Sequence, residues 1–324
     1  IQANIVKITF INYKLLIKLI IRGGNFMETL YTVLILIVAA AIIFGLSYMQ
    51  KKHLSFTKRV LAALVGGIIF GAIIQLIFGT GSEVITEANV WISIIGSGYV
   101  RLLNMIVIPL VFVAITSSIV NQEASNLKKS AFSIIAVLMI TTAISAGLGA
   151  TVSTVFNLDS SELLAGQAEV DRGASLESTL DDFQSKTIPE QITEIVPKNI
   201  FYAMTGQGSS ATLSVVFFAG FIGIATVGLR RKKPESAEAF TKFINMLNDV
   251  VMRLVTLVLR LTPFGVFALL TRFVSTSDFA EILRLFEFVL ASYLAIIIMF
   301  VIHLIILAIY KINPFTYLKK ASVP

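Results

Sequence analysis

The sequence predicts an all-α polytopic membrane protein, and three observations support this fold class. Among the 324 residues, 56% are hydrophobic and 14% are charged, whereas about a quarter of the residues in a soluble domain are charged. Several uninterrupted apolar runs have the length of about twenty residues that a helix needs to cross a hydrocarbon core. The basic residues gather in short linkers between these runs, so the formal net charge of +7 orients the chain in a membrane and predicts no nucleic-acid partner.

The apolar runs predict seven membrane spans from Met27 onward. In chain order the spans cover residues 30–49, 60–78, 99–120, 131–156, 213–229, 250–270 and 285–310. The linkers on one side, 51–59, 121–130, 230–249 and 311–320, carry fourteen lysines and arginines, and those on the other, 79–98, 157–212 and 271–284, carry five. Because basic linkers stay in the cytoplasm, we expect the native N-terminus outside and the C-terminal end of the chain inside.

Residues 1–26 differ in composition from the rest of the chain. They open at Ile1, are dominated by residues with AT-rich codons, and contain lysines that interrupt any span. One interpretation is a basic amphipathic helix on the membrane surface. We favour the alternative that this stretch is upstream DNA translated as protein, with Met27 as the native start.

The third span, GYVRLLNMIVIPLVFVAITSSI, carries Pro109 in its middle and Arg101 near its N-terminal end. A proline at this depth removes a backbone donor and clashes with an earlier carbonyl, so it would break most soluble helices. In a membrane bundle the freed carbonyl is satisfied by neighbouring helices or water, and the kink is tolerated. Arg101 is expected to anchor the span at the headgroups.

The external linker before the fifth span changes character along its length. Its first part is acidic and polar, which suggests partial disorder. Residues 188–196 then have apolar positions at helical spacing, Pro197 ends this helix, and Gly206 and Gly208 interrupt the approach to the next span. Two interpretations stay open: a discontinuous helix of the kind that lines transporter cavities, or an ordinary interfacial helix.

The sixth span contains two arginines. Residues 234–250 carry a helix-start pattern and one apolar stripe, so we expect a helix that runs on into the span, with a break at Pro263 and Gly265. A buried arginine at mid-span must be paired or face water, which makes it a functional candidate. Arg253 lies near the inner interface and is interpreted as an anchor, so Arg260 is the better candidate.

The sequence lacks the signatures of an enzyme. No HExxH, GxSxG, Walker or GxGxxG motif stands before a helix, cysteine is absent, and carboxylates inside the spans are scarce. His53 and His303 lie too far apart to suggest a metal pair, and His303 is interpreted as a helix-contact residue. We therefore expect no enzymatic activity, no cofactor and no metal centre.

A polar cluster stands out within the fourth span, ITTAISAGLGATVST. The hydroxyls of Thr141, Thr142 and Ser145 are oxygen ligands of the kind that a sodium ion prefers, and Gly147 and Gly149 would allow close helix approach. The alternative is routine helix packing through small residues.

Six segments together resemble the dicarboxylate/amino acid:cation symporter family. They are FTKRVLAALVGGIIFGAIIQLIFG, GYVRLLNMIVIPLVFVAITSSI, IPEQITEIVPKNIF, VVFFAGFIGIA, LRLTPFGVFALLTRF and INPFTYLKKA. The similarity runs from about Met27 to Lys320 and is greatest to the bacterial branch that takes up L-cystine. It implies a cation-coupled amino-acid symporter of the bacterial cell membrane, with L-cystine as the favoured substrate and Na⁺ or H⁺ as the coupling ion. The alternative substrates are glutamate and C4-dicarboxylates, and a membrane-embedded enzyme or a purely structural membrane protein are the rival classes.

The resemblance also implies the glutamate-transporter-homologue fold and a homotrimer in the lipid bilayer. Thr141 and Thr142 fall where the family places a threonine-serine pair at a sodium site, although Leu138 stands where a tyrosine would be. The implied parts are an extra leading helix and basic loop at 27–59, scaffold helices at 60–130 and 197–272, an acidic external loop at 158–196, and transport-domain helices at 131–157 and 273–324. Because the family's first re-entrant hairpin begins where this sequence stops, we expect an N-terminal part of a transporter whose substrate contacts lie beyond Pro324.

Overall fold

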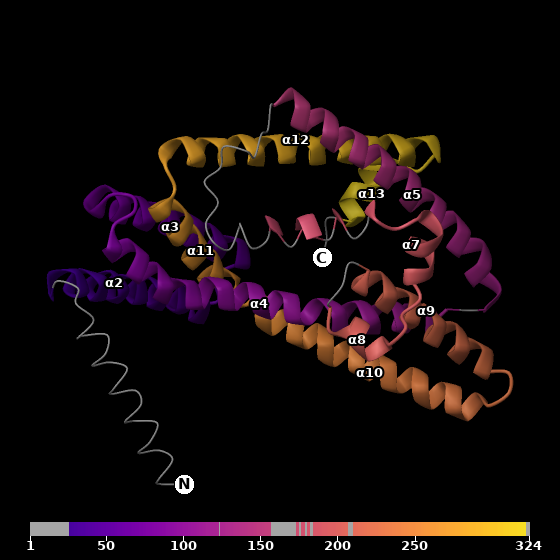
Figure 1. Cartoon of the computed structure of the whole chain (residues 1–324). Coiled ribbons are helices and arrows are strands. Elements are labelled where there is room, and N and C mark those ends of the chain that lie inside the picture. The colour runs from indigo at the N-terminus through magenta and orange to yellow at the C-terminus, as the bar shows by residue number, and fades with distance from the viewer. Residues whose placement is uncertain are drawn as a thin grey trace, which may run out of the picture. The chain divides into compact units, whose positions relative to one another are not determined.

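The computed structural model describes residues 26–122, 124–156, 173–174, 176–178, 180–181, 184–206 and 210–321. Every regular element among these residues is a helix, as the sequence predicts (Figure 1). The helices are α2 (Phe26–Lys51), α3 (Phe56–Phe78), α4 (Glu83–Val120), α5 (Ala124–Val155), α7 (Ile188–Glu194), α8 (Ile200–Met204), α9 (Ala211–Leu229), α10 (Pro234–Leu259), α11 (Thr262–Thr276), α12 (Phe279–Ile309) and α13 (Pro314–Ala321). The predictions for residues 1–25, for most of the acidic loop and for Gly208 lie outside the described residues.

The described residues form six or seven candidate membrane spans, which agrees with the predicted seven when a bent helix pair counts as one span. Within the described residues, six helices are long and apolar enough to cross a membrane, and the bent pair α10 and α11 makes a seventh when it is taken as one span. The chain is therefore a multi-pass membrane protein. Its helices form two compact units, one from Ile1–Val113 with Asn245–Asp278 and one from Ala114–Ile244 with Phe279–Pro324.

The third span differs from its prediction, because α4 begins at Glu83 and is 38 residues long. The segment assigned to a linker is thus helical from Glu83 onward. Its buried residues Val84, Ile85, Ala88 and Ile92 recur at helical spacing and pack into the core of the first unit. Gly96 and Gly98 do not interrupt the helix, and α4 also continues through Pro109.

The first unit is held together by α3 and α11. A Cβ added to Gly67 would lie 2.9 Å from the carbonyl oxygen of Phe267, and one added to Gly71 would lie 2.8 Å from that of Thr271. The glycines therefore let the two backbones meet without intervening side chains. Phe70 and Phe267 stack in the same interface with ring centroids 5.9 Å apart.

In the second unit, α9 packs on the C-terminal end of α4. A Cβ on Gly223 would lie 2.7 Å from Ile119, and the buried hydroxyl of Thr116 donates to the Ala219 carbonyl at 3.4 Å. The guanidinium of Arg230 donates to the carbonyl oxygens of Val120 and Gln122 at the end of α4. These contacts satisfy helix-end carbonyls that have no partner within their own helix.

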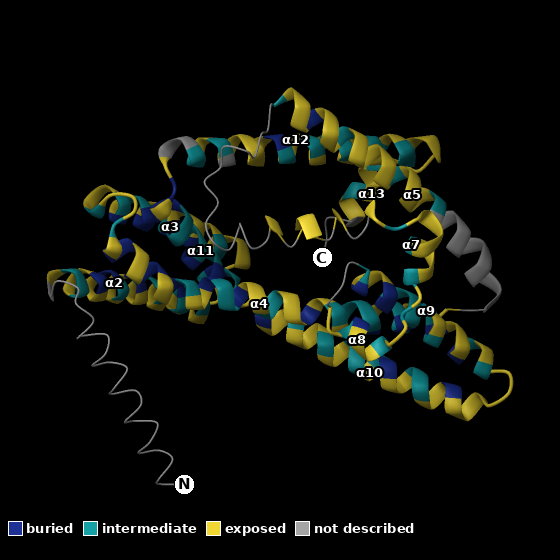
Figure 2. Cartoon of the chain, in the orientation of Figure 1, coloured by how far each residue is buried: buried dark blue, intermediate teal, exposed yellow. Residues whose placement is uncertain are grey.

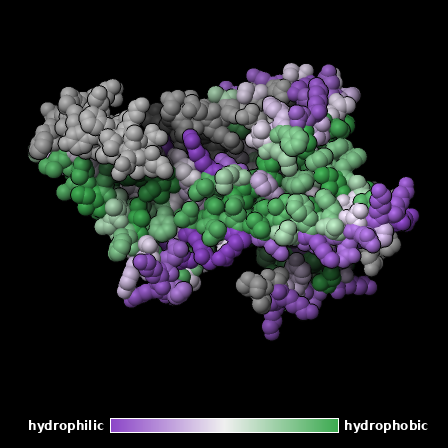
Figure 3. Space-filling view, turned by 90° about the horizontal axis from the view of Figure 1, so that it is seen from below, coloured by the Kyte–Doolittle hydropathy of each residue, from purple (hydrophilic) through white to green (hydrophobic). Residues whose placement is uncertain are grey.

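Hydrophobic side chains remain exposed along most of the helices. Figure 2 shows exposed and intermediate residues around most of the coloured turns of α5 and α12, and the described side chains of α12 include a single buried one, Ala291. On the face seen in Figure 3, hydrophobic residues form broad patches with hydrophilic residues gathered beside them. Such surfaces are expected of helices whose surroundings are lipid.

Candidate functional site

The predicted polar cluster lies on α5, and two of its hydroxyls bond to their own helix. Thr141 Oγ1 donates to the Val137 carbonyl at 2.8 Å, and Ser145 Oγ donates to the Thr141 carbonyl at 2.8 Å. This local bond is the usual state of a hydroxyl inside a membrane helix. It commits the hydroxyl proton to the helix and leaves the oxygen lone pairs free to accept from, or to ligate, another group.

Thr142 lies one position along the helix and is exposed. Its hydroxyl makes no hydrogen bond with any residue that the structure describes, so both its proton and its lone pairs are available. Thr141 and Ser145 are four residues apart and share a helix face, whereas Thr142 projects from the adjacent face. The three oxygens therefore provide part of a coordination shell and not a complete one.

A pocket of about 370 Å³ lies between α5 and α12. Ser145 and Leu148 line it from α5, while Met299, Phe300 and His303 line it from α12. His303 Nδ1 lies 2.8 Å from the Met299 carbonyl oxygen, and since a carbonyl only accepts, Nδ1 carries the proton. The structure thus places Ser145 beside His303, while Thr141 and Thr142 lie outside this lining.

Sequence analysis missed the α12 side of this pocket. It interpreted His303 as a helix-contact residue and did not connect it with Ser145. The signal was present as helical periodicity, because Ile296, Met299, Phe300 and His303 recur at spacings of three and four residues on one face. Nothing in the sequence, however, says which helix that face meets.

The structure contradicts the predicted close helix approach at Gly147 and Gly149. Among the described residues, nothing lies within 4 Å of a Cβ added to either glycine. Residues two apart point to different sides of a helix, and a close approach requires glycines on one face. Gly67 and Gly71, four residues apart on α3, meet this condition.

Between residues 184 and 206 the chain forms two short helices, α7 and α8, which fits both the discontinuous and the interfacial interpretation. Helix α7 ends at Glu194 ahead of Pro197, and Gly206 takes a positive φ of 73° after α8. Asn199 is the N-cap of α8: its side-chain oxygen accepts a hydrogen bond from the backbone N–H of Phe201 at 2.9 Å.

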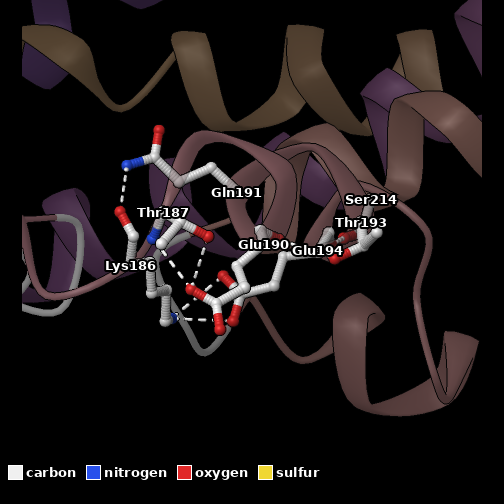
Figure 4. Close-up of polar contacts among 7 residues, drawn as sticks. All are labelled: Lys186, Thr187, Glu190, Gln191, Thr193, Glu194 and Ser214. Carbon is white, nitrogen blue, oxygen red and sulfur yellow. Dashed lines mark hydrogen bonds and ion pairs between the residues drawn. The ribbon is translucent and has the colours of Figure 1, made fainter.

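The start of α7 carries a cluster of charged residues (Figure 4). The carboxylate of Glu190 accepts from the backbone N–H and the hydroxyl of Thr187, both at 2.8 Å. The backbone hydrogen bond, and then the hydroxyl, hold the pKa of Glu190 below its usual value. Lys186 Nζ pairs with Glu194 at 2.8 Å, and Ser214 on α9 donates to the Glu194 carbonyl at 3.2 Å. A pocket of about 740 Å³ opens beside these residues.

Arg260 occupies a different setting from the one predicted. The break in the sixth span falls at Arg260 and Leu261, ahead of Pro263, and the axes of α10 and α11 differ there by 44°. Arg260 is exposed, not buried, and its side chain makes no ion pair with the described residues. Gly265 does not break the helix, because it lies within α11 against the ring of Tyr99.

The similarities to known proteins cover most of the chain. Residues 56–324 match the sodium:dicarboxylate symporter family. The chain is 46% identical over 296 residues to the L-cystine uptake protein TcyP of Shouchella clausii, covering 91% of this chain and 64% of that protein. It is 45% identical over 296 residues to TcyP of Bacillus subtilis, with the same coverages. It is 49% identical over 276 residues to TcyP of Bacillus thuringiensis subsp. konkukian, covering 85% of this chain and 60% of that protein.

The chain spans about three fifths of the length of these curated relatives, with coverages of 64% and 60%. Its seven candidate spans, its broken α7 to α9 segment and the match over residues 56–324 agree with one another. The chain therefore belongs to the sodium:dicarboxylate symporter family, a family of transporters and not of enzymes.

Proposed function

We propose that the protein is a cation-coupled symporter that imports an amino acid, with L-cystine as its substrate. The observation that carries this proposal is the identity of 45% to 49% with proteins named for L-cystine uptake, extending over at least 85% of this chain. Glutamate or a C4-dicarboxylate is the alternative substrate, because the family as a whole is named for dicarboxylates.

We assign a coupling Na⁺ to the hydroxyl cluster of α5; were H⁺ the coupling ion, its site would be elsewhere, because an alcohol does not take up a proton near neutral pH. Thr141 and Thr142 are the proposed ligands, and Ser145 is a further candidate one turn along. The support is geometric. The hydroxyls of Thr141 and Ser145 donate their protons to carbonyl oxygens of α5, so the lone pairs of the hydroxyl oxygens are available to a cation. Arg260 remains a candidate contact for an anionic group at the bend between α10 and α11.

The protein is further proposed to act as a homotrimer with a static scaffold and a mobile transport domain. The scaffold would comprise residues 60–130 and 197–272, and the transport domain would include 131–157 and 273–324. Its C-terminal region would face the cytoplasm, because fourteen of the linker lysines and arginines lie on that side. Since the chain has no cysteine, a single cysteine at Lys233 should be shielded from an impermeant label in intact cells, and one in the 160–185 loop should react. The reverse pattern would overturn this orientation.

Uptake of labelled L-cystine by the full-length protein tests the function. In cells that lack their own cystine carriers, saturable uptake should appear and should be inhibited by unlabelled L-cystine more than by glutamate or succinate. Replacing Na⁺ by choline, at several external pH values, identifies the coupling ion. Uptake that is inhibited by succinate and not by L-cystine would replace the proposed substrate with a dicarboxylate.

A further inference from the structure

The turn between α2 and α3 in the first unit concentrates positive charge. Four basic residues lie within nine positions: Lys51, Lys52, Lys58 and Arg59. The three lysines are exposed, and no Asp or Glu occurs in the sequence between Glu28 and Glu83. The turn therefore has no neighbouring carboxylate from its own stretch of chain to neutralise it.

Arg59 differs from the lysines because part of its guanidinium is buried. Its Nε and Nη1 are shielded from solvent and make no hydrogen bond. Arginine keeps its charge at any physiological pH, so these are cationic donors without an acceptor. Leaving such a donor unpaired is costly, and a native structure normally supplies a partner for it. Arg59 therefore indicates a missing acceptor at this turn.

Two aromatic residues fix the depth of the turn. Lys52 Nζ lies 4.9 Å from the centroid of the Tyr48 ring, and the guanidinium carbon of Arg59 lies 6.0 Å from that of Phe56. Aromatic side chains gather at the membrane–water interface, and α3 begins its span at Phe56. Arg59 thus lies at headgroup level, where lipid phosphates are the abundant anions.

Arg230 shows what a satisfied arginine at a span end looks like. In the second unit, its guanidinium donates to the carbonyl oxygens of Val120 and Gln122. The protein itself supplies the acceptors there. No residue in the described part of the chain does the same for Arg59, so its acceptor lies outside these residues.

We propose that the α2–α3 turn binds the phosphodiester headgroup of an acidic phospholipid. Arg59 supplies the donor fork: its guanidinium turns outward when the headgroup binds, so that two parallel N–H groups meet two phosphate oxygens. Lys52 and Lys58 supply flanking charge, which favours an acidic lipid over a zwitterionic one because a choline would add a cation beside the lysines. This site is separate from the proposed transport site and does not depend on it.

A single tryptophan can report on this site. Trp91 is the only tryptophan among the 324 residues, so Trp91→Phe combined with Phe56→Trp, with any tryptophan in the remainder of the full-length protein also replaced by Phe, places one fluorophore beside Arg59. The full-length protein is reconstituted in phosphatidylcholine vesicles that contain brominated phosphatidylglycerol, or brominated phosphatidylcholine as the reference. The ratio of quenching gives the lipid preference, which we expect to favour phosphatidylglycerol by about fivefold for each cation engaged.

Two variants that conserve charge separate a bound headgroup from diffuse attraction. Arg59→Lys loses the fork, so the preference should fall roughly tenfold, the effect of one hydrogen bond between charged groups. Lys51→Arg, which has no role in the proposed site, keeps an exposed charge in the same turn and should leave the preference unchanged. The unfolding temperature in the two lipids, measured without the probe substitutions, should follow the same order. Equal quenching by both lipids, or full preference in Arg59→Lys, would overturn the proposal, and so would loss of the preference on adding inorganic phosphate.

Discussion

Two helix pairs, α3 with α11 in the first unit and α5 with α12 in the second, use glycine in opposite ways. Gly67 and Gly71 lie so close to α11 that a Cβ would come within 2.9 Å of a backbone oxygen, whereas one on Gly147 or Gly149 would meet nothing within 4 Å. Helix α3 carries Gly66, Gly67 and Gly71, and α5 carries Gly147 and Gly149. The difference shows that the register of small residues on one face determines how closely helices pack.

The polar residues of the two pairs differ in the same sense. Thr271 on α11 donates to the Gly67 carbonyl of α3 at 3.4 Å, and Gln75 on α3 donates to the Ser277 carbonyl at 2.6 Å. Thr141 and Ser145 instead donate to carbonyls of their own helix. The hydroxyl of Thr271 therefore joins two helices, whereas those of Thr141 and Ser145 bond within α5 and keep oxygen lone pairs free for a further ligand. Because the hydroxyls of the second arrangement do not tie α5 to α12, that arrangement suits a helix pair that binds an ion or moves.

The largest expected effect is a loss of stability when Gly71, which lies against α11, is replaced by alanine. Gly71→Ala places a Cβ 2.8 Å from the Thr271 carbonyl oxygen and 2.9 Å from Val274 Cβ, so α3 and α11 must separate. Overpacking of this kind costs about 1–3 kcal/mol, which should lower the unfolding temperature in detergent by several degrees.

Gly147→Ala is the matched control on α5. Because its Cβ meets no neighbour, the change should leave stability unaltered or raise it slightly through the better helix propensity of alanine. Equal loss of stability in both variants would contradict the contrast between the two pairs.

The next effect concerns ion binding on α5. Replacing Thr141 and Thr142 together by valine keeps their shape and removes the oxygen ligands. The apparent affinity of the full-length transporter for its coupling cation should fall about tenfold, the lower end of what a disrupted ion site loses, while expression stays unchanged. Cation titrations of L-cystine uptake measure this. An unaltered cation dependence would assign the pair to helix packing alone.

The sequence predicts the spans well and the contacts between them poorly. The apolar runs predict the number of spans, because the ability of a helix to cross a membrane depends on its length and hydrophobicity, which are local properties of the sequence. The start of α4 was placed sixteen residues too late, at 99 and not at Glu83, because its first part carries charges and polar residues that lower its hydropathy without breaking the helix.

The candidate site shows the same limit. The hydroxyl cluster of α5 is visible in the sequence, but its proximity to His303 depends on which face of α12 meets α5. Likewise, the exposure of Arg260 follows from a bend that begins ahead of Pro263. These features depend on how segments that are distant in the sequence pack together. The periodicity of residues along one helix does not determine that packing.

A smaller effect distinguishes hydroxyls that join helices from those that do not. Thr271→Val removes the bond from a fully buried hydroxyl to α3 and should cost about 0.6 kcal/mol, the average for hydrogen bonds between membrane helices. Ser145→Ala removes only a bond within α5 and should leave stability unchanged. Unfolding with a steric trap resolves the difference. A greater loss for Ser145→Ala would show that its hydroxyl does bind across the interface.

The smallest effect is a local response to pH at α7, whose first turn is held by Glu190. Because hydrogen bonds from Thr187 lower the pKa of Glu190, the folded form of this turn is favoured above the unfolded pKa, and the advantage is lost as pH falls through the lowered value. A spin label on Ile192→Cys, the chain's single cysteine, should therefore become more mobile on acidification. Glu190→Ala removes the acceptor of both Thr187 bonds and should give the mobile signal at every pH. Helix α13 provides the control, since Asn313, which does not titrate, accepts from the Phe315 N–H at 3.0 Å at its start, and a label on Thr316→Cys should not respond. A response of both labels would mean that acid loosens the second unit as a whole and that the charge on Glu190 is not the cause.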